Sequence, residues 1–220
     1  MIKSARFFTA ACSAFLLFLM IGLQPHASAQ GNFTWNGLGV DNNWGTGANW
    51  VGGTAPSNPQ NILNFAGATR TSSTNNLSAY GAGFQIYFNS GAGAFTLSGN
   101  AINFYNFGAT GPLIENDSTN LQTLSFSQID VENNMTLYAN TGNLSFSSTF
   151  YLDASSTLTT NASAGKTVTF TGSINNGTAS VGKLNITGAG TTILSTASAF
   201  TGGVTLNSGT LGIFAGNNLG

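Results

Sequence analysis

The chain has 220 residues, of which 41% are hydrophobic and only 5% are charged, and its formal net charge is −1. A chain with so few cations cannot neutralise a row of phosphates, so nucleic acid is excluded as a partner. Because aromatic and branched apolar residues recur along the whole chain, the low charge indicates an ordered protein rather than a disordered one.

Residues 1–29 have the layout of a secretory signal peptide. A cationic start is followed by a mostly apolar run over residues 7–23 and by the small-residue sequence Ala27-Ser28-Ala29 before Gln30. We therefore expect a secreted or cell-surface protein, with the periplasm as the alternative location. The apolar run is short for a membrane span and contains polar residues, so we expect no membrane insertion after cleavage.

Cleavage removes the only cysteine, Cys12, and the only histidine, His26. The remaining chain has three cations and six carboxylates, which gives a net charge of 3 − 6 = −3. It can form no disulfide, and it lacks the nitrogen and sulfur ligands that zinc, iron and copper usually require. We expect no cofactor.

Residues 30–66 form a separate, tryptophan-rich segment. All three tryptophans of the chain, Trp35, Trp44 and Trp50, lie here among asparagines and glycines. We interpret them as a cap, because a stack of strands must cover the apolar face at its first end. The alternative is a carbohydrate-binding site in which the flat aromatic faces stack on sugar rings.

Residues 67–220 are predicted to form short β-strands, in which apolar residues alternate with polar ones and Gly, Asn or Ser clusters separate the strands. The clearest segments are 84–88, 95–97, 102–104, 124–126, 135–137, 144–146, 168–170 and 184–186. Apolar residues at sustained helical spacing are missing, so we expect an all-β protein.

Strand spacing alone fits a β-sandwich or jelly roll as well as a β-solenoid. Two features favour the solenoid. The residues that alternate with the apolar ones are mostly Thr, Ser and Asn, which suit stacked polar ladders. Charges are almost missing from the turns, as expected where each coil places like residues above like. We therefore predict a right-handed parallel β-helix, with the sandwich or jelly roll as the alternative.

Two pairs of carboxylates, Glu115 with Asp117 and Asp130 with Glu132, are spaced so that both members project from one face of a strand. Such pairs act as acid and base on glycosidic bonds, and β-helices carry polysaccharide hydrolases and lyases. Because the chain without its leader has no histidine beside them, we interpret the pairs as solvated faces or turn caps and assign no catalytic residue. Asp130 and Glu132 are also candidate calcium ligands.

Residues 187–220 contain a recognisable repeat. It consists of Gly188-x-Gly190 followed by Thr-Thr-Ile-Leu, then Phe-Thr-Gly-Gly-Val-Thr from Phe200, and then Ser-Gly-Thr-Leu from Ser208. This pattern resembles the autotransporter-associated β-strand repeat of secreted bacterial passenger proteins. The order of tryptophans, asparagines and glycines in residues 33–66 is similar to the N-terminal segment common among those proteins. The resemblance implies a β-solenoid at the bacterial surface and no particular reaction.

Together these features predict a non-catalytic structural or adhesive passenger that meets a glycan or protein surface through a neutral Thr/Asn/Ser face. The expected partners are glycans or another β-solenoid chain. Family members usually continue into further coils where this chain stops, so we expect a truncated chain or a subunit completed by another chain. The alternative function is a polysaccharide-binding module, or a polysaccharide lyase or hydrolase on the same scaffold.

Overall fold

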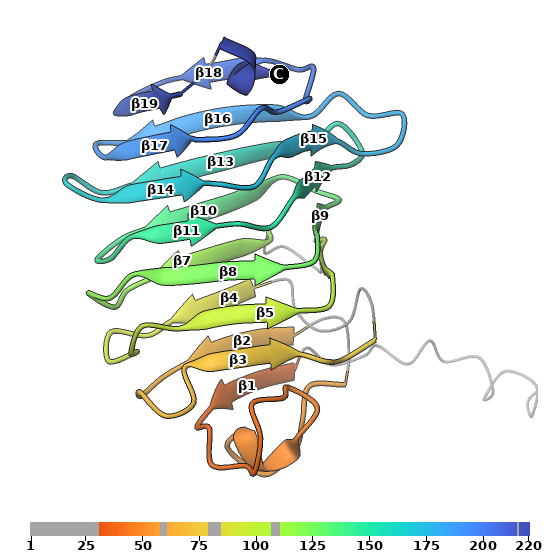
Figure 1. The fold of residues 1–220 in the computed structure, drawn as a ribbon, viewed down its shortest axis with the longest axis vertical. Helices are drawn as coiled ribbons and strands as arrows, with labels where there is room; N and C mark the ends of the chain where they lie inside the picture. The colour runs from red at the N-terminus through yellow and green to blue at the C-terminus, as the bar shows by residue number, and fades with distance from the viewer. Residues whose placement is uncertain (1–30, 58–60, 79–84, 107–110, 215) are drawn as a thin grey trace, which may run out of the picture.

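The computed structural model describes residues 31–57, 61–78, 85–106, 111–214 and 216–220. The predicted signal peptide, residues 1–29, lies outside the described residues. Parallel strands wind into a β-solenoid of about 6 turns. In Figure 1 the strands in front run to the right and those behind run back to the left while the chain rises, which makes the coil right-handed. In the described part of the chain, no helix combines the length and the apolar character needed to cross a membrane.

Three parallel sheets, here named A, B and C, form three sides of the coil. Sheet A contains β1 (Gly31–Trp35), β2 (Asn61–Phe65), β4 (Gln85–Phe88), β7 (Leu113–Asn116), β10 (Met135–Ala139), β13 (Thr157–Ala162), β16 (Lys183–Gly188) and β18 (Val204–Leu206). Sheet B contains β3 (Ser72–Asn75), β5 (Thr96–Gly99), β8 (Gln122–Phe126), β11 (Leu144–Phe146), β14 (Thr167–Phe170), β17 (Thr191–Leu194) and β19 (Thr210–Ile213). Sheet C contains β6 (Ile102–Phe104), β9 (Ile129–Val131), β12 (Phe150–Leu152) and β15 (Ile174–Asn176). The described residues also include two short 3-10 helices, η1 (Gly47–Asn49) and η2 (Gly216–Leu219).

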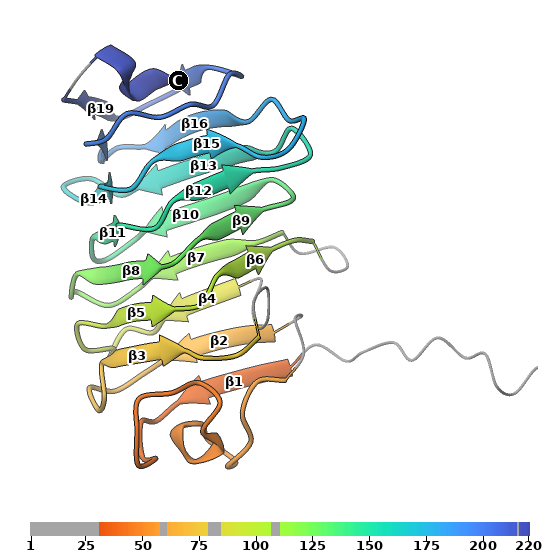
Figure 2. The same ribbon diagram turned by 45° about the vertical axis from the view of Figure 1, so that its right-hand side comes forward.

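Each complete coil contributes one strand to every sheet, in the order A, B, C. The strands β7, β8 and β9 form one coil, and β10, β11 and β12 form the next. Every pairing between these strands is parallel. Figure 2 shows the strands of sheet C stacked on the third side. The predicted right-handed parallel β-helix is therefore confirmed, and the β-sandwich or jelly-roll alternative is wrong.

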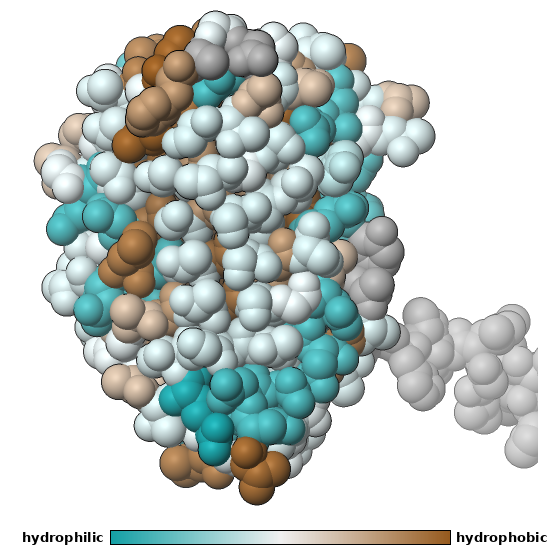
Figure 3. All heavy atoms as spheres, viewed as in Figure 1, coloured by the Kyte–Doolittle hydropathy of each residue, from teal (hydrophilic) through white to brown (hydrophobic). Residues whose placement is uncertain are grey.

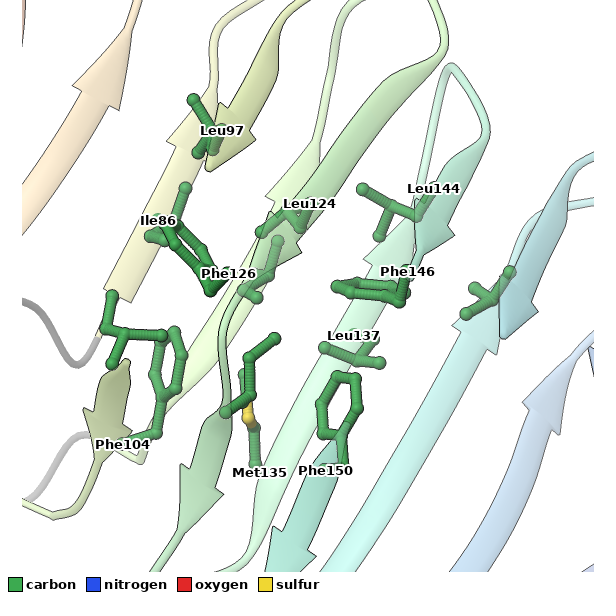
Figure 4. Close-up of a cluster of buried hydrophobic side chains, with 14 of the residues drawn as sticks. Ile86, Leu97, Phe104, Leu124, Phe126, Met135, Leu137, Leu144, Phe146 and Phe150 are labelled. Carbon is green, nitrogen blue, oxygen red and sulfur yellow. The ribbon is translucent and has the colours of Figure 1, made fainter. Parts of the chain in front are cut away.

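Strand alternation decides which side chains enter the core. In β8 the side chains of Gln122, Leu124 and Phe126 are buried, while Thr123 and Ser125 face outward and are half-buried. Parallel pairing gives the next coil the same inward and outward positions, because Leu124 pairs with Phe146 and Thr123 with Ser145. The interior is thus a continuous apolar column, part of which Figure 4 shows.

The corners between sheets A and B depend on buried amide side chains. Gln122 accepts a hydrogen bond from the backbone N–H of Phe95 at 2.8 Å and donates to the carbonyl of Gly93 at 2.9 Å. Asn116 donates to the carbonyl oxygens of Asn120 and Asn143, each at 2.9 Å. These bonds satisfy backbone groups where the chain turns and cannot pair in a sheet.

The glycines of the predicted repeat are required by close packing between coils. Gly188 has a φ of 85°, a left-handed conformation that favours glycine. A Cβ atom on Gly188 would overlap the carbonyl of Ala162, and one on Gly190 would overlap the carbonyls of Ser163 and Lys166. The repeat motif therefore marks corners where one coil lies directly on the backbone of the preceding coil.

The segment of residues 30–66 is more than a cap. Its described residues include β1 and β2, which pair with each other as the first two strands of sheet A. This segment therefore contributes the first two strands of sheet A as well as the loop that carries the tryptophans. The physical reason is that Leu63 and Phe65 of β2 already point into the apolar column.

Phe146 tests how far the apolar column stabilises the fold. Its ring is fully buried and lies 5.4 Å from Phe170 and 5.3 Å from Phe150, centroid to centroid. We expect Phe146→Ala to lower the free energy of unfolding by about 3–5 kcal/mol, because it leaves a cavity between coils.

Chemical denaturation measures this loss, and Phe214→Ala is the matched control because Phe214 is 76% exposed. The control should change the free energy of unfolding by no more than about 0.5 kcal/mol. Equal losses in the two variants would contradict the assignment of Phe146 to a packed core.

Candidate functional site

The three tryptophans lie inside the first end of the solenoid, not on its surface. Trp35, Trp44 and Trp50 are each at most 1% exposed. The indole N–H of Trp44 donates to the hydroxyl of Ser73 at 3.1 Å, and that of Trp50 donates to the carbonyl of Trp44 at 2.7 Å. With both ring faces packed against the core, the indoles offer no platform to a sugar. This burial is what a cap requires.

The loop that carries these tryptophans covers the first edge of the stack. Residues 42–44 pair with Thr74 of β3, and the loop lies below β1 in Figure 1. Asp41 holds this loop together: its carboxylate accepts hydrogen bonds from the backbone of Asn43 and the side chains of Thr46 and Asn49. The backbone bond from Asn43 is the main reason that the pKa of Asp41 lies below its usual value.

The pair Glu115 and Asp117 lies on the outer face of sheet A. Glu115 is flanked in register by Tyr87 and Tyr138. The side chain of Asn140 donates to Asp117 at 2.7 Å and to Glu115 at 3.4 Å. Burial, and then the charge of Asp117, raise the pKa of Glu115. The pair is thus partly buried and tied to a neighbouring coil.

The pair Asp130 and Glu132 lies in a groove on the outer face of sheet C, which we call the sheet C groove. Its volume is about 700 Å³. The residues that line it are Asn103, Gln128, Asp130, Glu132, Tyr151, Asp153, Asn176, Gly177 and Thr178.

The register of sheet C aligns the residues at the centre of the groove. Asp130 of β9 pairs with Asn103 of β6 on one side and with Tyr151 of β12 on the other. The flanking residues of each strand are apolar and fully buried, so these three polar side chains point outward. Glu132 and Asp153 directly follow the paired residues of β9 and β12, which brings two more carboxylates to the same face.

Hydrogen bonds hold most of these side chains in place. Gln128 donates to Oδ1 of Asp130 at 2.6 Å, and Asn103 donates to Oε1 of Glu132 at 2.6 Å. Asp153 accepts from the backbone N–H of Thr178 at 3.1 Å. The Asp153 carboxylate lies so close to the backbone of the next coil that a Cβ atom at residue 177, a glycine, would overlap it.

Asp130 is the most unusual residue of the groove. It is only 5% exposed, and its second oxygen, Oδ2, accepts no hydrogen bond from any residue that the structure describes. Burial raises the pKa of Asp130, the charges of Asp153 and Glu132 raise it further, and the hydrogen bond from Gln128 lowers it. This carboxylate is therefore largely shielded from solvent, although it lines the groove.

Among the described residues, no cationic side chain lines the groove. None of its lining residues is a lysine or an arginine, and Arg70 donates to Asn42 in the capping loop at 3.2 Å. Within the residues that the structure describes, no three His, Cys, Asp or Glu side chains are placed to hold a metal ion. Asp130 and Glu132 remain candidate calcium ligands, but no third carboxylate, histidine or cysteine among the described residues is placed to bind the same ion.

Sequence reasoning found two residues of the groove and missed most of the others, including Asn103, Tyr151 and Asp153. A signal was present: an apolar-polar-apolar triplet begins at Ile102, Ile129 and Phe150, and these three residues are register partners in sheet C. Because these short triplets recur at unequal spacing, the sequence alone does not show that they pair with one another in a single sheet.

The fold and the groove define this chain as a parallel β-helix with a polar, acidic groove on one side. It matches no protein-family model, no curated protein and no solved structure. The resemblance to the autotransporter-associated repeat therefore stays a prediction that depends on the motifs of residues 187–220.

The raised pKa of Asp130 predicts how stability depends on pH. The folded protein holds a proton on Asp130 at pH values where the unfolded chain has released it. The contribution of Asp130 to stability should therefore be lost as the pH rises above the usual carboxyl pKa of about 4 and through its raised folded-state pKa, and Asp130→Asn should remove this part of the pH dependence. Thermal melts of the wild type and the variant across this range measure the effect.

Asp41→Asn is the control of opposite sign. The pKa of Asp41 is lowered, so its contribution to stability is present at neutral pH and lost as the pH falls below the usual carboxyl value. A wild type and an Asp130→Asn variant with identical pH dependence would show that Asp130 ionises normally.

Proposed function

We propose that this chain is a secreted or cell-surface, non-catalytic structural or adhesive β-solenoid. The observation that carries the proposal is the neutrality of sheet B: none of its seven strands contains a charged residue. A flat polar face without charges loses little hydration energy when it meets another surface, because no ion has to be desolvated.

The outer face of sheet B carries two neighbouring ladders of hydroxyl residues. One ladder follows the register partners Thr96, Thr123, Ser145 and Thr169 across four coils. In the second, Ser98 pairs with Ser125. Figure 3 shows this face as rows of residues of near-neutral hydropathy. A regular array of this kind supports many weak contacts at once, which is how a repetitive surface adheres.

The location rests on the sequence. The cationic, apolar and small-residue sections of residues 1–29 support export, and the resemblance of residues 187–220 supports a bacterial surface. The partners that fit are glycans or another β-solenoid chain. The second is supported by the last coil, where Leu206, Ile213 and Phe214 are exposed apolar residues; apolar residues gather at that end in Figure 3.

Charged substitutions on sheet B test the adhesive face. We expect the double variant Thr123→Lys, Ser145→Lys to be retained roughly tenfold less on glycan-coated and protein-coated sensor surfaces, because each unpaired ammonium must lose water on contact. The chain is expressed with its own leader and collected from the medium. The mass of the secreted product checks cleavage before Gln30.

The matched control is Thr136→Lys, Thr159→Lys. These two residues pair in sheet A and are outward-facing and half-buried, like the sheet B pair. Equal loss of retention in both double variants would show that net charge, not the sheet B face, decides adhesion. No retention of the wild type on any surface would contradict the adhesive function.

A polysaccharide hydrolase is the second candidate, because three carboxylates line the sheet C groove and the pKa of one of them is raised. A general acid in a glycosidase needs such a raised pKa. If this candidate is correct, the wild type releases reducing ends from neutral polysaccharides, and Asp130→Asn and Glu132→Gln each abolish the release. Binding without release by the wild type would exclude it.

A further inference from the structure

We infer that the sheet C groove binds an uncharged glycan chain lying along the solenoid axis. This inference deepens the adhesive function proposed above and rests on it, but it uses a different side of the molecule. Sheet B is the neutral face of that proposal, while the groove is formed by sheet C and the turns that follow it.

The first argument comes from two buried oxygen atoms that have no partner. Oδ2 of Asp130 and Oδ1 of Asn103 are both buried, and neither accepts a hydrogen bond within the described part of the chain. A buried polar atom left in this way costs about 1–3 kcal/mol, and more where it carries charge. Both atoms are acceptors on register partners, so a ligand that bonds them has to supply hydrogen-bond donors to adjacent coils. The hydroxyls of a sugar are such donors.

The second argument comes from charge. Asp130, Glu132 and Asp153 line the groove, and no lysine or arginine does. A uronate, sulfate or phosphate group would therefore meet unopposed carboxylates. Electrostatic repulsion excludes anionic polysaccharides and leaves ligands that donate hydrogen bonds without carrying negative charge.

The third argument comes from size and shape. A volume of about 700 Å³ lies within the usual range of sites for organic ligands and is far larger than an ion needs. Asn103, Asp130 and Tyr151 lie on three successive strands of sheet C. Because neighbouring strands are about 4.8 Å apart, the row extends about 10 Å along the axis. That length fits a chain of sugars better than a single small group.

Tyr151 supplies the apolar contact that sugar binding requires. Its side chain is half-buried at the groove, directly beside Asp130 in register. Its hydroxyl makes no hydrogen bond to any residue in the part of the chain described by the structure. An aromatic ring with a free hydroxyl can pack on the C–H face of a sugar and bond its hydroxyls at the same time.

The test is direct binding of neutral oligosaccharides, with glucose, galactose, mannose and N-acetylglucosamine series as the probes. Isothermal titration of the secreted chain identifies a series that binds. Tyr151→Ala and Asp130→Asn should each weaken that binding about tenfold or more, because each removes a stacking surface or a charge-assisted hydrogen bond.

Two sheet A variants serve as matched controls. Tyr138→Ala removes a half-buried outward tyrosine, and Glu115→Gln neutralises a carboxyl with a raised pKa. Both should bind sugars as the wild type does. Melting curves show which variants remain folded. If Tyr151→Ala or Asp130→Asn does not fold, Asp153→Asn is measured in its place, because Asp153 also lines the groove.

Several results would overturn the inference. They are absence of binding to every neutral series, binding that the groove variants leave unchanged, and a preference for cationic glucosamine oligomers. Calcium binding to the groove without any sugar would assign the site to an ion instead. The proposed adhesive function fails separately, because it is measured by retention of the sheet B lysine variants. If the wild type binds no neutral sugar but is still retained on protein-coated surfaces, the glycan site in the sheet C groove is contradicted and the adhesive function of sheet B is not.

Discussion

Parallel pairing between successive coils is the constraint on which the rest of this structure depends. Each residue of a strand lies beside its counterpart one coil away, as Leu158 lies between Met135 and Leu184. This stacking satisfies the hydrogen-bonding groups of the backbone, but it also places side chains at equivalent positions of successive coils in contact along the whole column. Apolar residues gain from such contacts, hydroxyls tolerate them, and like charges repel. The scarcity of charge in the sequence is therefore a consequence of the fold.

The same constraint explains why the corners are built from amides and glycines. A strand can pair with the next coil, but a corner has backbone groups that no sheet satisfies. Asn116 and Gln122 are buried there and bond several carbonyls and N–H groups at once. Gly188 allows the chain to turn against the carbonyl of Ala162. Composition rich in Asn and Gly thus reflects the turning of the coil, not disorder.

Much of the fold could be predicted from the sequence, because alternation is a local property. The segments around Leu124 and Phe126, or Leu144 and Phe146, reveal their inward faces without knowledge of their neighbours. Among the strands of sheet C, residues 102–104 are identified in this way, whereas Ile129–Val131 is not. The groove could not be found either. Its residues come from separate coils, and only the register, which depends on unequal turn lengths, brings them to one face.

The placement of the carboxylates remains the strongest reason to treat the sheet C groove as functional. The chain has six acidic residues, and three of them, Asp130, Glu132 and Asp153, line this one groove. Glu132 and Asp153 follow directly paired residues of adjacent coils, an arrangement that the stacking constraint penalises. Asp130 is buried beside them with an unpaired oxygen. Because sheet B carries no charge in its strands, the gathering of these carboxylates on sheet C is what supports the proposal that their oxygens bind a ligand.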